Sequence, residues 1–190
     1  DGSAFVREEI QRPAPPSRPS AGLPAWSIIV GGGAAGLAAA EALRAEGYAG
    51  TVILMSADPS PPCDRPNLSK DYLAGTAEAD LIPLRPPEFY PKHHIDLQLD
   101  TRVTAIEPGA HAVLLADGSR VTYGALLLAT GAEPIRLGIP GASLPHVHVL
   151  RTLADSNALI ARANNVRHCV VVGASFIGLE VAASLRTRGL

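Results

Sequence analysis

Short apolar runs divide this chain into stretches of different pattern. The runs of strand type cover residues 27–30, 51–55, 125–129 and 169–172. Such runs are typical of strands buried on both faces of a parallel sheet. Helical patterns predict helices over 34–46, 86–93, 153–163 and from 176 onward, and a compact loop with a short helix over 61–75. Short alternating segments predict a β-meander with strands at 102–106, 112–115 and 120–123. The fold class predicted is therefore α/β, doubly wound and Rossmann-like, with an inserted β-meander.

Two glycine-rich turns follow apolar runs and have the spacing of dinucleotide-binding motifs. The motif positions are Gly31, Gly33 and Gly36 in the first turn and Gly173, Ser175 and Gly178 in the second. In such a motif the first glycine permits a tight turn, the second lets a pyrophosphate approach, and the third lets helix and strand pack closely. Ser175 replaces the middle glycine, so we expect altered nucleotide affinity there. Two motifs predict an enzyme that passes electrons between two dinucleotides.

The residue that binds the adenosine ribose is irregular in the first motif. An acidic side chain is expected at the end of the second strand. Asp58 comes slightly late for this role, so Ser56 takes the more favourable position. A serine hydroxyl can bond a ribose hydroxyl, though less strongly than a carboxylate does.

Charge and composition exclude several function classes. The chain has 16 Lys and Arg against 18 Asp and Glu, with no basic block, so nucleic acid is not an expected partner. No apolar run approaches the ~20 residues of a membrane span, so no membrane contact is expected either. We expect a cytoplasmic protein of unknown oligomeric state.

Cysteine and histidine placement predicts no metal site. Cys63 and Cys169 have neither metal-ligand nor dithiol spacing, and Cys169 is expected in a buried strand. His93 and His94 are adjacent, so their side chains diverge by about 100° on a helix, which is poor ligand geometry.

One further stretch carries a family resemblance. Cys63-Asp64-Arg65-Pro66-Asn67-Leu68-Ser69-Lys70, taken with the first glycine motif, Ala129-Thr130-Gly131-Ala132 and Phe176–Glu180, resembles the ferredoxin-reductase-like and apoptosis-inducing-factor-like flavoproteins. These form a branch of the FAD-dependent pyridine nucleotide–disulfide oxidoreductases. The resemblance implies FAD in the first unit and NADH or NADPH, written NAD(P)H, in the second. It also implies electron delivery to an iron–sulfur acceptor, either a ferredoxin or an attached Rieske domain.

The resemblance also implies residue roles. Lys70 would lie beside the isoalloxazine and pair with Glu180, and these two are the expected catalytic residues. A fixed cation there would stabilise the negative charge that a flavin gains when it accepts hydride. The remaining cofactor contacts implied, besides the motif positions, Ser56 and Asp58, are Ala35, Arg65, Val103, Thr130, Gly131 and Arg151.

The sequence departs from the family pattern in ways that bear on function. Cys63 stands where the family usually has an aromatic residue. The paired cysteines of the disulfide reductases are absent from 65–70, which argues against that activity. Alternative activities on the same scaffold are a quinone, nitrite or monodehydroascorbate-type reductase. A different class of alternative is a non-catalytic nucleotide-binding module for redox sensing or scaffolding.

The domain organisation expected is that of an N-terminal fragment. Residues 1–25 would end a preceding domain and form a proline-rich linker, with Asp1–Glu9 similar to the last hairpin of a Rieske domain. Residues 26–150 would form the N-terminal part of the FAD-binding domain. Residues 151–190 would form a linker helix and the start of the NAD(P)-binding domain. We expect this chain to be inactive alone, because most of its second nucleotide domain is missing.

Overall fold

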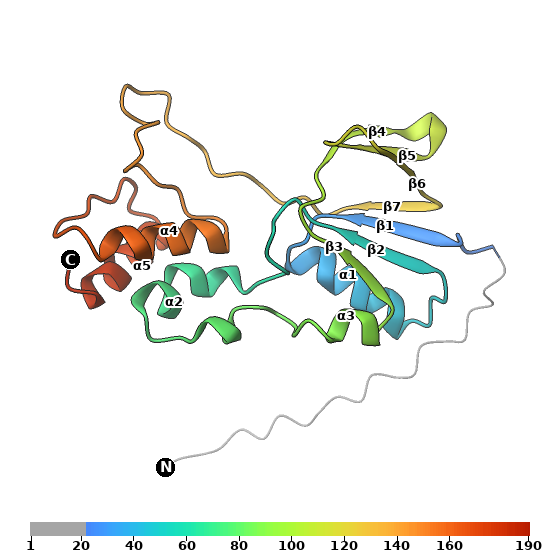
Figure 1. Cartoon of the computed structure of the whole chain (residues 1–190), viewed down its shortest axis with the longest axis horizontal. Coiled ribbons are helices and arrows are strands. Elements are labelled where there is room, and N and C mark those ends of the chain that lie inside the picture. Colours follow the sequence, from blue (N-terminus) through green and yellow to red (C-terminus); the bar gives the residue numbers. More distant parts are fainter. Residues whose placement is uncertain (1–21) are drawn as a thin grey trace, which may run out of the picture.

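A parallel sheet forms the centre of the computed structural model, which describes residues 22–190. The strand order is β3-β2-β1-β7, with β1 at Trp26–Val30, β2 at Thr51–Met55, β3 at Ile95–Gln98 and β7 at Ala125–Leu128. Ile28 of β1 is in register with Ile53 of β2 and with Leu126 of β7. The first motif thus lies between two neighbouring strands, and its turn leaves β1 at the carboxyl edge of the sheet (Figure 1).

Helices cover one face of this sheet. Helix α1 (Ala34–Ala45) follows β1, and the short α3 (Phe89–Lys92) precedes β3. The core on this face contains Ile29, Leu37, Ala40, Tyr48, Val52, Leu54, Tyr90 and Ile95. Ala40 and Val52 are fully buried, so a small residue on the helix faces a branched residue on the sheet.

The β-meander covers the other face (Figure 1). Its strands are β4 (Val103–Glu107), β5 (Ala112–Leu115) and β6 (Arg120–Thr122), in that order and antiparallel; the 3-10 turn η3 (Pro108–Ala110) joins the first two. The turn before β6 forms because Asp117 Oδ1 accepts a hydrogen bond from the Ser119 amide and Gly118 adopts φ +85°. Val113 packs on Ile28 and Val30 of β1, which excludes water between the meander and the sheet.

A separate helical layer carries the second motif. It contains the 3-10 helices η1 (Arg65–Ser69) and η2 (Ala79–Leu81) and the α-helices α2 (Asp71–Ala74), α4 (Leu153–Ala163) and α5 (Phe176–Thr187). Leu73, Ala163 and Leu185 join α2, α4 and α5 in one buried cluster. Thr152 caps α4 through a capping box with Asp155, which explains why this helix starts where the pattern predicts.

The predicted α/β fold with an inserted meander is confirmed, but several elements differ. Strand β3 is not apparent from the sequence pattern, because four residues carry little periodicity until they pair with β2. The predicted helix over 86–93 is a single turn, Phe89–Lys92. The expectations for residues 1–21, including the Rieske-like hairpin, lie outside the described part of the chain.

The prediction of a strand before the second motif is also wrong. No strand forms over 169–172, Cys169 is exposed rather than buried, and Val170 is 86% exposed. A strand needs a neighbour to satisfy its backbone groups, and none of the strands in 22–190 pairs with these residues. Over the same range, the helices are all shorter or more polar than a bilayer crossing requires.

Candidate functional site

A cleft of about 320 Å³ opens where β1, β2 and β7 end. Ligands bind at this edge in open α/β sheets, because the strand ends and helix N-termini meet there. Eight of the residues predicted from the sequence line it: Gly31, Gly33, Ser56, Asp58, Arg65, Val103, Thr130 and Arg151. The fold therefore brings residues up to 120 positions apart to a single cavity.

The first motif forms a cradle in which Gly31 and Gly36 leave no room for a Cβ beside neighbouring backbone atoms. Gly31 has φ +123°, and a Cβ there would overlap the carbonyl of Ala129. A Cβ at Gly36 would overlap the carbonyl of Gly31, so strand and helix touch through their backbones. Gly33 is the N-cap of α1, and no side chain caps the helix there. The amides of the first turn, which includes the exposed Ala35, therefore have no side-chain cap, and free amides at a helix N-terminus suit an anion.

Two guanidinium groups converge on this cradle. Arg65 Nη1 lies 3.6 Å from the position a Cβ on Gly33 would take. Arg151 Nη2 lies 3.0 Å, and Arg65 Nη1 3.9 Å, from the same position on Gly131, whose φ is +72°. Within residues 22–190, neither Arg65 nor Arg151 forms an ion pair with a carboxylate. Guanidinium groups bind phosphate oxygens in a bidentate manner, so both are available to a pyrophosphate.

The end of β2 supplies a hydroxyl. Ser56 is 2% exposed, and its Oγ accepts a hydrogen bond from the Asp58 amide at 3.2 Å. The Asp58 carboxylate is itself engaged, since Oδ1 accepts from the Ser60 amide at 2.9 Å. Ser56 thus keeps a hydroxyl hydrogen to donate, and both side chains line the cleft.

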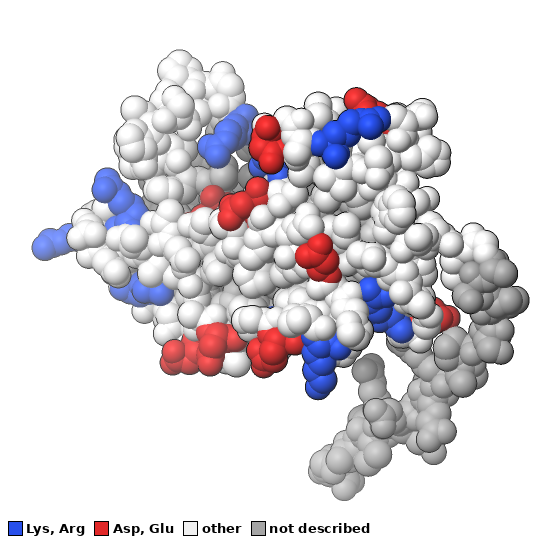
Figure 2. All heavy atoms as spheres, turned by 45° about the vertical axis from the view of Figure 1, so that its right-hand side comes forward, with Lys and Arg blue, Asp and Glu red and all other residues white. Residues whose placement is uncertain are grey.

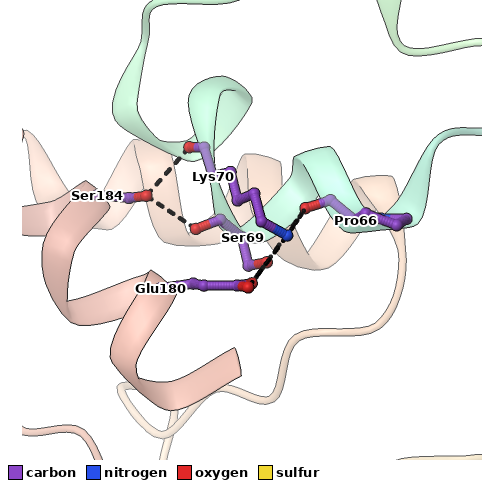
Figure 3. Close-up of polar contacts among 5 residues, drawn as sticks. All are labelled: Pro66, Ser69, Lys70, Glu180 and Ser184. Atoms are coloured by element: carbon purple, nitrogen blue, oxygen red, sulfur yellow. Dashed lines mark hydrogen bonds and ion pairs between the residues drawn. The ribbon is translucent and has the colours of Figure 1, made fainter. Parts of the chain in front are cut away.

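The Lys70 ammonium contacts Glu180 at a second place, outside the lining of the cleft (Figure 3). Lys70 Nζ lies 3.1 Å from Glu180 Oε1 and donates to the Pro66 carbonyl at 3.2 Å. Ser69 Oγ donates to the other carboxylate oxygen, Oε2, at 2.6 Å. The Ser69 hydrogen bond, followed by that of Lys70, lowers the pKa of the Glu180 carboxyl below its usual range. Helix η1 runs from Arg65 in the cleft to Ser69, so it links the two places.

The second motif repeats the backbone geometry of the first. Gly173 has φ +109°, and a Cβ at Gly178 would overlap the Gly173 carbonyl. In the same way, a Cβ at Gly36 would overlap the Gly31 carbonyl. Ser175 is the N-cap of α5 with φ −82° and ψ 179°, an extended conformation open to any residue. The serine therefore strains no backbone, and its effect on nucleotide affinity stays a prediction.

Sequence reasoning missed several cleft residues. Thr101, Arg102, Glu133 and Thr152 also line the cavity. Arg102 adjoins the predicted Val103, and Thr152 adjoins the predicted Arg151, so adjacency to a predicted contact was the available signal. Gly32 was also missed: a Cβ there would overlap the side chain of Ser56.

Among residues 22–190, the Cys63 thiol is a further group whose pKa is shifted. Burial raises the pKa of the Cys63 thiol, outweighing the neighbouring Arg65 guanidinium that lowers it, so the thiol stays protonated. In the part of the chain that the structure describes, no three His, Cys, Asp or Glu side chains gather in a way that could hold a metal ion. Charged side chains of both signs are interspersed on the face drawn in Figure 2.

The residues of the cleft fit a dinucleotide. A Cβ at Gly31 or Gly36 would overlap backbone atoms, so the glycines allow the turn and the helix to pack closely. The uncapped N-terminus of α1 and the two arginines supply hydrogen-bond donors for a pyrophosphate. Arg65, Arg151 and the α1 amides would hold its phosphates, and Ser56 would hold a ribose hydroxyl.

Comparisons with known proteins agree with this geometry. A family model described as pyridine nucleotide-disulphide oxidoreductase matches residues 27–190. Rhodocoxin reductase of Rhodococcus erythropolis is 42% identical over 163 residues, covering 86% of this chain and 38% of that protein. Apoptosis-inducing factor 3 of Homo sapiens is 38% identical over 169 residues, covering 88% of this chain and 27% of that protein.

Solved structures share the fold. The covalent putidaredoxin reductase–putidaredoxin complex matches with a TM-score of 0.80 and 37% identity, covering 87% of this chain and 40% of that chain. A ferredoxin reductase from Rhodopseudomonas palustris matches with a TM-score of 0.83 and 40% identity, covering 87% and 41%. The chain spans between 27% and 41% of the length of these relatives. It belongs to the pyridine nucleotide-disulphide oxidoreductase family.

Proposed function

We propose that this chain is part of a FAD-dependent oxidoreductase that passes electrons from NAD(P)H to an iron–sulfur acceptor, a ferredoxin or an attached Rieske-type domain. The observation that carries the proposal is the 3.1 Å contact between Lys70 and Glu180. Lys70 follows the η1 helix that starts in the cleft of the first motif, and Glu180 lies on the helix of the second motif. Electron transfer between two dinucleotides requires that their binding units lie close together, and this ion pair joins the two units.

The first unit, residues 26–150, is proposed to bind FAD, and residues 151–190 to begin the NAD(P)H-binding unit. Support for the first assignment comes from the glycine cradle and the two guanidinium groups in the cleft. When bound, FAD supplies a ring that accepts a hydride and releases electrons singly. The protein supplies binding and orientation.

Lys70 and Glu180 are proposed as the catalytic residues. A lysine ammonium held in one place can stabilise negative charge that develops on a cofactor ring. The Lys70 side chain is 48% exposed, so alone it would sample many rotamers. Glu180 and the Pro66 carbonyl hold its Nζ from two directions and reduce that freedom.

The acceptor class rests on the relatives. Several are named as reductases of ferredoxin or rubredoxin, and one solved structure is a reductase joined to putidaredoxin. The fold alone does not select the acceptor, because sites rather than folds determine function.

A cytoplasmic location is proposed because Cys63 and Cys169 are both free thiols, which is typical of reducing compartments.

The experiment is a spectrum followed by turnover of the full-length protein. The purified protein should show the flavin absorption bands, and NADH or NADPH should bleach them anaerobically. Added ferredoxin should then be reduced in proportion to the NAD(P)H consumed. Lys70→Ala should slow the bleaching step by roughly 10- to 100-fold, the scale of losing a charge-assisted contact.

Lys92→Ala is the matched control. Lys92 is the other lysine of the chain, lies exposed at the end of α3, and forms no ion pair within the described residues.

Bound flavin that NAD(P)H never reduces would favour the sensing or scaffolding alternative. Reduction of quinone, nitrite or monodehydroascorbate in place of ferredoxin would keep the enzyme class and replace the acceptor.

A further inference from the structure

The two oxygens of the Glu180 carboxylate contact different donors, which belong to the neighbouring residues Ser69 and Lys70 (Figure 3). Lys70 Nζ lies 3.1 Å from Oε1, and Ser69 Oγ donates to Oε2 at 2.6 Å, a shorter contact than the 3.3 Å that separates this hydroxyl from the Pro66 carbonyl. The two donors differ in mobility: Ser69 is 5% exposed, whereas the Lys70 side chain is 48% exposed. A buried serine has one short torsion to fix, so the direction of the carboxylate is set by Ser69 more firmly than by Lys70.

A second serine fixes the backbone that carries these donors. Ser184 lies four residues after Glu180 on α5, hence on the same helix face. Its Oγ contacts the carbonyl oxygens of Ser69 at 2.8 Å and Lys70 at 3.1 Å, and it is 6% exposed. Arg188, a further four residues on, donates to the Leu73 carbonyl. One face of α5, together with its C-cap residue Arg188, therefore contacts the segment from Ser69 to Leu73 through polar groups.

Other charged groups do not share this role. The elements packed against α5 are η1 and α2, and α4 joins its apolar cluster. Among the described residues, Lys70 alone lies within ion-pair distance of Glu180. The other charged side chains on these elements, and that of the C-cap residue of α5, form no ion pair with Glu180; they are Arg65, Asp71, Asp155, Arg162, Arg186 and Arg188.

We propose that Ser69 is a positioning residue for the reaction: it aims the Glu180 carboxylate at Lys70 and thereby holds the Lys70 ammonium in one place. Ser184 assists by locking the Ser69–Lys70 backbone to α5. Ser69 touches neither nicotinamide nor flavin in this scheme; it acts through Glu180. The inference rests on the proposed function, because it assigns a purpose to the Lys70–Glu180 pair.

The test compares Ser69→Ala, Ser69→Thr and Ser156→Ala in the full-length holoprotein. Ser69→Ala deletes one oxygen and creates no overlap, so it should fold. Ser156→Ala is the matched control: Ser156 is fully buried and donates to the Leu68 carbonyl of the same η1 helix at 3.0 Å, but contacts no carboxylate. Two readouts are needed, namely the Glu180 carboxyl pKa by ¹³C NMR and the pH profile of flavin reduction by NAD(P)H.

We expect Ser69→Ala to raise the pKa of the Glu180 carboxyl and to move the acid limb of the pH profile upward in pH. Ser69→Thr keeps the hydroxyl and should restore both, and Ser156→Ala should move neither, although it lowers stability. The Glu180 carboxyl resonance is identified by its loss from the ¹³C spectrum of the Glu180→Gln variant. An unchanged pKa in Ser69→Ala, with flavin reduction intact, would overturn the inference and leave the proposed function standing. Absence of bound flavin would instead overturn the proposed function, while the NMR titration would still report on Ser69.

Discussion

The carbonyl oxygen of Gly31 occupies the space that a Cβ on Gly36 would need. Gly173 and Gly178 have the same relationship in the second motif. In both places the helix backbone therefore sits against the turn, with the helix N-terminus brought to the end of the preceding segment. Close backbone packing of this kind fixes where the amides of the first turn point.

Gly36→Ala should destabilise the protein. The new methyl group would meet the Gly31 carbonyl and, at 3.1 Å, Leu54 Cδ1. Overpacking of this kind costs about 1–3 kcal/mol and displaces α1 from the cleft. The urea concentration at the midpoint of denaturation and the content of bound flavin should both be lower than in the wild-type protein. Gly138→Ala is the control, because a Cβ there meets nothing within 4 Å; equal behaviour of the two variants would contradict the packing argument.

Arg65→Ala should weaken FAD binding. The guanidinium lies over the glycine cradle without a carboxylate partner in the described residues, so its charge is available to a phosphate. Loss of one charge-assisted hydrogen-bonding group costs ~1.5–3 kcal/mol, about 10- to 100-fold in Kd. FAD titration of the apoprotein, followed by fluorescence, measures this. Arg162→Ala removes an exposed arginine outside the cleft and should leave Kd unchanged.

The Glu180 carboxyl should contribute to the acid sensitivity of folding. Its pKa is lowered from the ordinary 4.5 by the Ser69 and Lys70 hydrogen bonds. A carboxyl with a lower pKa in the folded state stabilises that state above the unfolded pKa and loses this contribution as pH falls through the folded pKa. The difference in free energy of unfolding between wild type and Glu180→Gln should therefore be constant near neutral pH and shrink below about 4.5. A constant difference down to the lowest pH at which the protein folds would contradict the assignment.

The Cys63 thiol should react slowly with alkylating reagents. It is 7% exposed, and burial raises its pKa, so little thiolate forms at neutral pH. In a Cys169→Ser background, iodoacetamide should label Cys63 far more slowly in the native protein than after denaturation. Mass spectrometry of timed samples measures the rates. Fast native labelling would show that the site opens or that Arg65 outweighs burial.

Local sequence determined those elements whose signals lie within a few residues of one another. The strands at Thr51–Met55 and Ala112–Leu115 and the helix at Leu153–Ala163 have the predicted bounds. Apolar runs and a capping box specify such elements without reference to distant residues. The two glycine motifs were also predictable, because a turn, a close approach and a helix start each require a particular residue type.

Tertiary structure decided what depends on distant partners. Strand β3 exists because β2 offers it a hydrogen-bonding edge, whereas residues 169–172 form no strand because no described strand pairs with them. Arg65 and Arg151 meet over the cleft although 86 positions separate them, and Ser69 reaches Glu180 across 111. Local pattern encodes the backbone preference of a segment, but the neighbours of a side chain depend on how helices and sheet pack. The sequence therefore predicted eight of the residues that line the cleft, and packing revealed that Ser69, as well as Lys70, contacts Glu180.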